Sequence, residues 1–269
     1  MKKIFIIFLL FINFLYASII EDKIKNIVGN DTFLLHNNLI NSIIKKNNFI
    51  INGKIFYPKL LKSLNDNGLL RLRFNKPLDI NITFKVNNKP LKSMKILKDT
   101  LNSLGYAYYF TKSFNSTSKN FIWKIYFKSE YVIDPYGFNK ELNSINAFIE
   151  DINLTTPTNW CYTINFNNSH LFDFIPIELN EKIKLSKPLK PYMLKIVNGK
   201  KLTIRSHNLN HWFPKITFYD KDLNILGEIK KDRYYKGLLV NIPKNSYYVN
   251  IDDRYTLLNI KRGLSIILR

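Results

Sequence analysis

Three side chains that can supply oxygen ligands stand at alternate positions in one short segment. Asp220, Asp222 and Asn224 have the spacing with which an EF-hand calcium loop begins. That loop also requires glycine at its sixth position and a bidentate glutamate at its twelfth, where this sequence has Ile225 and Lys231. Aspartate and asparagine also favour turns, because their side chains bond to their own backbone. We therefore expect a hairpin turn here and no metal site.

Histidine and cysteine offer the other possible metal or catalytic chemistry. His207 and His211 are four residues apart, as two zinc ligands on a helix are, but their segment lies between predicted strands and lacks the adjacent glutamate. Cys161 is the only cysteine, so no disulfide can form within the chain. No histidine or basic residue stands near it in sequence to lower its pKa. We expect loop histidines and a buried cysteine.

Motifs typical of enzymes are missing from the sequence. It contains no G-x-S-x-G nucleophile motif, no glycine-rich phosphate loop and no serine–lysine pairing. The whole chain has only nine glycines, which are too few to suggest a glycine-rich loop that binds a ligand through its backbone. We therefore predict that the protein is not an enzyme and that it binds no cofactor.

Two tryptophans are candidates for carbohydrate binding. Trp160 and Trp212 would stack against sugar rings if their indole faces were exposed, and Phe213, Tyr247 and Tyr248 could extend such a platform. Core packing is the competing interpretation, because large aromatic side chains in strands usually bury their area.

A basic segment with two tyrosines is the candidate for partner binding. The letters "KKDRYYKG" separate two predicted strands, so we expect a hairpin tip. A solvated loop is the alternative, but tyrosine and arginine are enriched at binding hot spots, which favours docking onto an acidic partner. The predicted contact residues are Lys230, Lys231, Arg233, Tyr234, Tyr235 and Lys236.

The first residues have the pattern of a secretory signal peptide. Lys2 and Lys3 precede the apolar run "IFIIFLLFINFLY", and Ala17 is a small residue at the expected cleavage site. A retained anchor is the alternative, but the run is shorter than the roughly 20 residues that span a bilayer. We predict an exported, periplasmic protein whose residues 1–17 are removed, with no membrane span afterwards.

The net charge of +21 indicates an attraction to anionic surfaces. Lysine, asparagine and isoleucine recur throughout the chain, as in proteins of AT-rich genomes, and an exported protein seldom meets nucleic acid. We therefore expect no nucleic-acid partner. In a bacterial envelope the anionic partners would be lipid headgroups, an anionic glycan or an acidic protein surface.

The first half of the sequence predicts a small α/β module. Residues 18–48 should form an N-terminal helix, capped at Asp31, and a linker. Residues 49–134 should form the module, with a turn at Asn52–Gly53 and strands of alternating apolar residues. Between these strands, apolar residues recur at helical spacing and Gly105 follows them in the position of a helix end.

The second half predicts a β-sandwich. Residues 135–154 have a helical apolar stripe and should form a connecting helix, and the Pro- and Thr-rich letters "TTPTNW" mark a domain boundary. Residues 155–269 contain eight short strand patterns separated by turn signals, beginning with "WCYTINF". The fold class is therefore α+β, with an antiparallel, jelly-roll-like sandwich after the α/β module. A closed barrel is the alternative.

Two stretches resemble known periplasmic families. The segment "INITFKVNNKPLKSMKILKDTLNSLGYAYYF", within residues 69–130, resembles the short N-terminal α/β module of secretins and TonB-dependent receptors. The segments "KPYMLKIVNGKKLTIRS", "WFPKITFYDKDLNILGEI" and "GLLVNIPKNSYYVNI", within residues 190–260, resemble the C-terminal β-sandwich of MalM-type proteins. The first resemblance implies protein–protein docking without an active site, and the second implies architecture alone.

These features together predict a non-enzymatic scaffold or accessory protein of a bacterial envelope machine, such as a flagellar motor or a secretion complex. The composition and the secretin-like module are similar to those of periplasmic flagellar-motor disc and scaffold proteins in Campylobacter-type bacteria. A soluble periplasmic glycan-binding protein, using Trp160 and Trp212, is the alternative.

Overall fold

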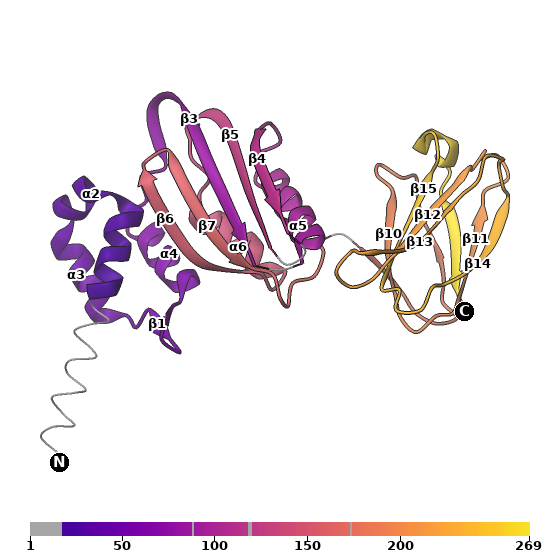
Figure 1. Cartoon of the computed structure of the whole chain (residues 1–269), viewed down its shortest axis with the longest axis horizontal. Helices are drawn as coiled ribbons and strands as arrows, with labels where there is room; N and C mark the ends of the chain where they lie inside the picture. The colour runs from indigo at the N-terminus through magenta and orange to yellow at the C-terminus, as the bar shows by residue number, and fades with distance from the viewer. Residues whose placement is uncertain (1–17, 88, 118–119, 173) are drawn as a thin grey trace, which may run out of the picture. The chain divides into compact units, whose positions relative to one another are not determined.

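The computed structural model describes residues 18–87, 89–117, 120–172 and 174–269. The chain divides into two compact units, with the division between His170 and Leu171 (Figure 1). The predicted signal peptide lies outside the described residues. Within the described part, no helix is both long enough and apolar enough to cross a membrane.

The first unit begins with short helices that are separated by sharp backbone changes. Gly29 has a φ of 86° and is the N-cap of the second helix, so Asp31 lies in the first turn and is not the predicted N-cap. The predicted turn at Asn52–Gly53 is confirmed, since both residues have positive φ between two paired strands. The elements are a helix over residues 18–28, α2 (Asn30–Leu35), α3 (Asn37–Lys46), β1 (Ile50–Ile51), β2 (Lys54–Ile55) and α4 (Tyr57–Asp66).

A five-stranded sheet forms the body of the first unit. Its strand order is β4-β5-β3-β7-β6; β3 and β7 run parallel, and the other neighbours run antiparallel. The helices α5 and α6 follow β3 and β5 in the sequence (Figure 1). The elements are β3 (Arg73–Val86), α5 (Pro90–Ser103), β4 (Phe110–Ser116), β5 (Phe121–Tyr131), α6 (Pro135–Ser144), β6 (Phe148–Thr156) and β7 (Asn159–Asn165).

Alternation along the strands gives the sheet one buried face and one solvated face. On β3 the side chains of Ile80, Ile82 and Phe84 are fully buried, which confirms the predicted strand. Phe84 contacts Phe138 of α6, with 5.8 Å between ring centroids, so α6 packs on this buried face. Asp134 is the N-cap of α6, and its carboxylate accepts hydrogen bonds from two backbone N–H groups of the first turn.

A helix does begin at residue 135 as predicted, but it is shorter than the predicted 135–154, and the predicted domain boundary is wrong. The helix α6 ends at Ser144, and residues from Phe148 onward form β6 instead of continuing the helix. The strand pattern "WCYTINF" is β7, which pairs with β3 in the first unit and buries Trp160 and Tyr162. A boundary at residue 155 would cut the β6–β7 hairpin, so the division lies after residue 170.

Two sheets that enclose one apolar core make up the second unit (Figure 1). The five-stranded sheet has the order β13-β12-β15-β10-β8, and the four-stranded sheet has the order β14-β11-β16-β9. The fold of the chain is thus mixed and mainly β, as expected, although β8 pairs with β10 in parallel. The strands are β8 (Ile175–Ile177), β9 (Lys182–Lys184), β10 (Tyr192–Ile196), β11 (Lys201–Ser206), β12 (Pro214–Tyr219), β13 (Ile225–Lys230), β14 (Gly237–Asn241), β15 (Tyr248–Asp253) and β16 (Leu264–Leu268).

Candidate functional site

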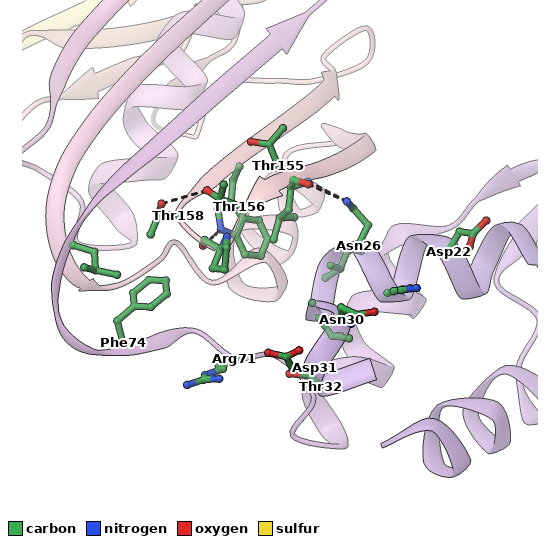
Figure 2. A pocket seen from close by; sticks show the side chains of 18 residues that line it. Asp22, Asn26, Asn30, Asp31, Thr32, Arg71, Phe74, Thr155, Thr156 and Thr158 are labelled. Atoms are coloured by element: carbon green, nitrogen blue, oxygen red, sulfur yellow. Dashed lines mark hydrogen bonds between the residues drawn. The ribbon is translucent and has the colours of Figure 1, made fainter. Parts of the chain in front are cut away.

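A groove of about 820 Å³ lies in the first unit, between the N-terminal helices and one end of the sheet (Figure 2). One wall comes from residues 22–32, which include the end of the first helix and the first half of α2. The other wall comes from the start of β3 and from the turn between β6 and β7. Sequence reasoning missed this groove.

Local backbone features explain why the groove stays open. Gly29 breaks the first helix with its positive φ, so the chain changes direction at the rim. On the opposite wall, the pairing of β3 with β5 shifts between Arg73 and Leu78. The pairing of β3 with β7 begins only at Asn81. The first residues of β3 are therefore not covered by β7, and Figure 2 shows Phe74 on this wall, opposite Asn26 and Asn30 of the helical wall.

Side-chain bonds hold the first helix against β6, the edge strand of the sheet. Asn26 donates through Nδ2 to the Leu154 carbonyl at 2.9 Å and accepts through Oδ1 from the Leu154 N–H at 2.9 Å (Figure 2). Lys23 Nζ donates to Asp151 Oδ1 at 2.8 Å, and the Tyr57 hydroxyl donates to the same oxygen at 2.7 Å. The helix thus satisfies backbone groups that a further strand would otherwise pair with.

The Asp151 carboxyl group is the centre of this clamp. Its burial alone would raise its pKa, but the hydrogen bonds from Lys23 and Tyr57 outweigh that effect and hold the pKa below its usual value. For Tyr57, burial and the neighbouring Asp151 carboxylate both raise the pKa of the hydroxyl. Asp151 is therefore ionised and Tyr57 protonated near neutral pH, the states that the two bonds require.

The groove has an apolar floor and a rim of both charges. The rim carries the acids Asp22 and Asp31 and the cations Lys25 and Arg71. In the part of the chain that the structure describes, the side chains of Asp31 and Arg71 form no hydrogen bond or salt bridge. The apolar lining residues, which come from both walls and which we call the floor, are Ile27, Val28, Phe74, Leu78 and Trp160.

The polar side chains of the lining are carboxylates, amides, hydroxyls, two cations and one indole. No histidine or cysteine is among them, and the two acids are exposed on different helices. A general base needs a nucleophile or a polarised water beside it, and no such pair is present in the described lining. The described residues also contain no cluster of three or more histidine, cysteine or acidic residues that could hold a metal ion.

Neither candidate tryptophan presents its face for sugar stacking. Trp160 is only 4% exposed and donates its indole N–H to the Pro157 carbonyl, so a buried ring with an anchored nitrogen closes the groove floor. Trp212 is fully buried in the core of the second unit, where its N–H bonds to the Asp252 carbonyl. The predicted platform is wrong, because both rings contribute to packing.

The predicted hairpin tip at residues 230–236 is also wrong. β13 pairs with β12 in one sheet and β14 pairs with β11 in the other, so residues 231–236 cross between the sheets. Tyr235 packs against the core, whereas Tyr234 is 55% exposed. Lys230 forms a salt bridge with Glu228 at 2.8 Å. The predicted binding of an acidic partner by Lys230, Lys231, Arg233, Tyr234, Tyr235 and Lys236 stays a prediction.

Two other loops lie beside this crossing segment. The backbone N–H of Tyr235 donates to the Trp212 carbonyl at 2.8 Å, and that of Arg254 donates to the Phe213 carbonyl at 2.9 Å. Asn210 donates through Nδ2 to the Gly263 carbonyl at 2.9 Å. We call residues 207–213, 231–236 and 254–263 the loop end of the second unit. His207 and His211, which were predicted to be loop histidines, belong to it.

The predicted turn in the second unit is confirmed. The strands β12 and β13 form a hairpin, and Asp220 Oδ1 accepts from the backbone N–H groups of Asp222 and Asn224 at 2.8 and 2.9 Å.

In the first unit, Cys161 is half-buried on the solvated face of the sheet. Burial raises the pKa of its thiol, while Lys85, which the fold brings close, opposes that rise.

Comparison with known proteins yields no family assignment. No protein-family model matches the chain, and no curated protein matches it. The pre-peptidase C-terminal domain of a collagenase from Bacillus anthracis is 11% identical, with a TM-score of 0.26 over 37% of this chain and 96% of that chain. A β-glucosidase from Paenibacillus barengoltzii is 15% identical, with a TM-score of 0.18 over 35% of this chain and 11% of that chain. Such low scores carry no argument, and the resemblances to secretins and MalM-type proteins stay predictions.

Proposed function

We propose that this protein is a non-enzymatic docking protein of a bacterial envelope machine and that the groove of the first unit holds a segment of a partner protein. The groove carries the proposal, because its size lies within the roughly 300–1,000 Å³ of ligand sites and its floor is apolar. The proposal includes export to the periplasm, which is supported by the signal-like pattern of the first residues.

The rim favours a polypeptide over an anionic polymer. The chain as a whole carries a charge of +21, yet the rim holds Asp22 and Asp31 against Lys25 and Arg71. A phosphate- or uronate-bearing chain would meet two carboxylates there, which disfavours it. A peptide segment can place an apolar side chain over Phe74 and offer both charges and backbone groups to the rim.

Site-specific crosslinking tests this function. A photoreactive amino acid replaces Thr155, an exposed rim residue, and in a control protein it replaces the exposed Lys54 of the β1–β2 hairpin. We expect irradiation of living cells to attach an envelope protein at position 155 and not at position 54. The Phe74→Ala variant, which removes the ring from the floor, should lower the yield at position 155 by about tenfold.

The outcome separates docking from the other function classes. Capture of no protein above the level at position 54 contradicts the proposal. Equal capture with and without Phe74 would show contact with the rim surface alone, which also contradicts a groove-bound segment. Attachment of a glycan instead of a protein would favour the glycan-binding alternative, although neither tryptophan face is available to it.

A further inference from the structure

Four large apolar side chains project from the loop end of the second unit. Each is more than half exposed: Leu209 at 63%, Tyr234 at 55%, Tyr255 at 62% and Leu258 at 67%. They come from all three loops, and strand register brings these loops to one end, since Ser206 pairs with Leu264 and Pro214 pairs with Asp253. Exposed apolar groups gathered in this way mark an interaction surface.

The same surface is strongly basic. Its only acidic residue is Asp232, which pairs with Arg254. The exposed Tyr234 and Tyr255 lie against cations, with Lys236 Nζ 5.5 Å from the first ring and the Arg254 guanidinium 5.6 Å from the second. Its six cationic residues are Lys231, Arg233, Lys236, Arg254, Lys261 and Arg262.

A buried carboxylate fixes two of these loops, residues 207–213 and 254–263, before any partner arrives. Asp253 is 4% exposed and accepts hydrogen bonds from the backbone N–H groups of Phe213, Tyr255 and Thr256 at 2.8 to 3.0 Å. It also accepts from Asn259 Nδ2 at 3.0 Å. Preformed loops lose little conformational entropy on docking, so the apolar tips are available at low cost.

We propose that the loop end docks onto an anionic phospholipid surface. Three of the four apolar tips have a cation next to them: Lys236 beside Tyr234, Arg254 beside Tyr255, and Arg262, whose guanidinium donates to the Leu209 carbonyl. A bilayer interface has the matching layers, with phosphates outside and apolar chains beneath. An acidic protein surface supplies the carboxylates but not the apolar layer under them. This docking is independent of the groove in the first unit.

Vesicle binding tests the proposal with the chain that begins at Ser18, because the apolar residues before it would themselves bind lipid. The probes are vesicles of phosphatidylcholine, alone or with about 30% phosphatidylglycerol, a content chosen to give a negative surface potential. We expect sedimentation with the anionic vesicles only, and weaker binding as salt increases.

One set of variants tests the apolar contribution to vesicle binding, and a second set tests the charged contribution. Leu209→Ala and Leu258→Ala should each weaken binding by about tenfold, because each removes inserted apolar area. Ile225→Ala, at the far end of β13 and 66% exposed, is the matched control and should bind normally. Arg233→Gln combined with Lys261→Gln should weaken binding about 30-fold, from about fivefold for each basic residue. The control pair, Lys221→Gln with Lys244→Gln, should change it far less.

Thermal melting of each variant checks that the exposed substitutions leave the fold intact. Failure to bind anionic vesicles overturns the proposal, as does equal binding to pure phosphatidylcholine. If Leu209→Ala and Leu258→Ala bind as well as the parent, the contact is only electrostatic and the docking mode is wrong. Soluble polyglutamate is the competitor. If it displaces the protein from anionic vesicles, and if the leucine variants bind polyglutamate as weakly as they bind the vesicles, an acidic protein is the partner instead.

Discussion

The clamp between the first helix and β6 predicts a measurable coupling between Lys23 and Asp151. Lys23→Met and Asp151→Asn are made singly and together, and the free energy of unfolding of the first unit is compared across the cycle. Each single variant removes the same charge-assisted hydrogen bond of 2.8 Å. The coupling free energy is the part of the loss that the two changes share.

The expected magnitude follows from the partial exposure of the pair. The side chains are 17% and 37% exposed. Fully exposed ion pairs couple by about 0.2–1 kcal/mol, whereas buried hydrogen bonds to charged groups contribute about 1.5–3 kcal/mol. We therefore expect a coupling of about 1–2 kcal/mol. The i,i+4 pair of Lys62 and Asp66, with side chains 60% and 50% exposed, is the control and should couple more weakly than Lys23 and Asp151 do.

Urea unfolding followed by tryptophan fluorescence measures this coupling. A Trp212→Phe background removes the only tryptophan of the second unit, so Trp123 and Trp160 report on the first unit alone. Hydrogen exchange of residues 148–156 gives a local readout, because the Leu154 N–H loses protection when the helix leaves β6. A coupling no larger than that of the control pair would refute the role assigned to the clamp.

Three further predictions concern both units. Because the pKa of Asp151 is lower in the folded than in the unfolded state, where it is about 3.9, the carboxylate stabilises the first unit at pH values above about 3.9. This stability is lost as the pH falls through the folded pKa. Asp151→Asn should therefore make the urea midpoint depend less on pH in the acidic range. Gly263→Ala should cost more than about 2 kcal/mol of stability in the second unit, because φ is 77° and the new Cβ would meet the Leu185 carbonyl. The control is Gly68→Ala, where φ is 67° but the new Cβ would enter open space, so it should cost about 1 kcal/mol. Tyr235→Ala should lower the melting temperature of the second unit and Tyr234→Ala should not, since only the first ring packs on the core.

Local signals in the sequence were sufficient for several elements. The alternation of apolar and polar residues predicted the second part of β3, and the helical spacing of apolar residues predicted α5. Gly105 follows the end of that helix, as predicted, with a φ of 86°. The turn at Asp220 was also predictable, because the carboxylate bonds to backbone groups only two and four residues away. In each case the decisive interactions lie within a few residues of one another.

Features that depend on distant residues were not predictable in the same way. The alternation of β7 indicates a strand but not that its neighbour is β3, about 80 residues earlier and parallel to it. The six residues from Lys231 to Lys236 can close a hairpin or cross between sheets, and only the pairing of β14 with β11 decides. The groove depends on Gly29 and on the bond between Asn26 and Leu154, which no local pattern links.

The two bonds of Asn26 and the ion pair of Lys23 also set an order of events during synthesis. Their partners on β6 lie 128 residues further along the chain, so the first helix emerges from the ribosome long before its docking site exists. Closing so long a loop is slow compared with local folding. Until β6 is complete, Lys23 and Asn26 of this helix lack their partners. In that interval the helix is a natural target for a chaperone, and deletion of residues 18–28 would leave the β6 edge of the finished sheet open to a strand from another molecule.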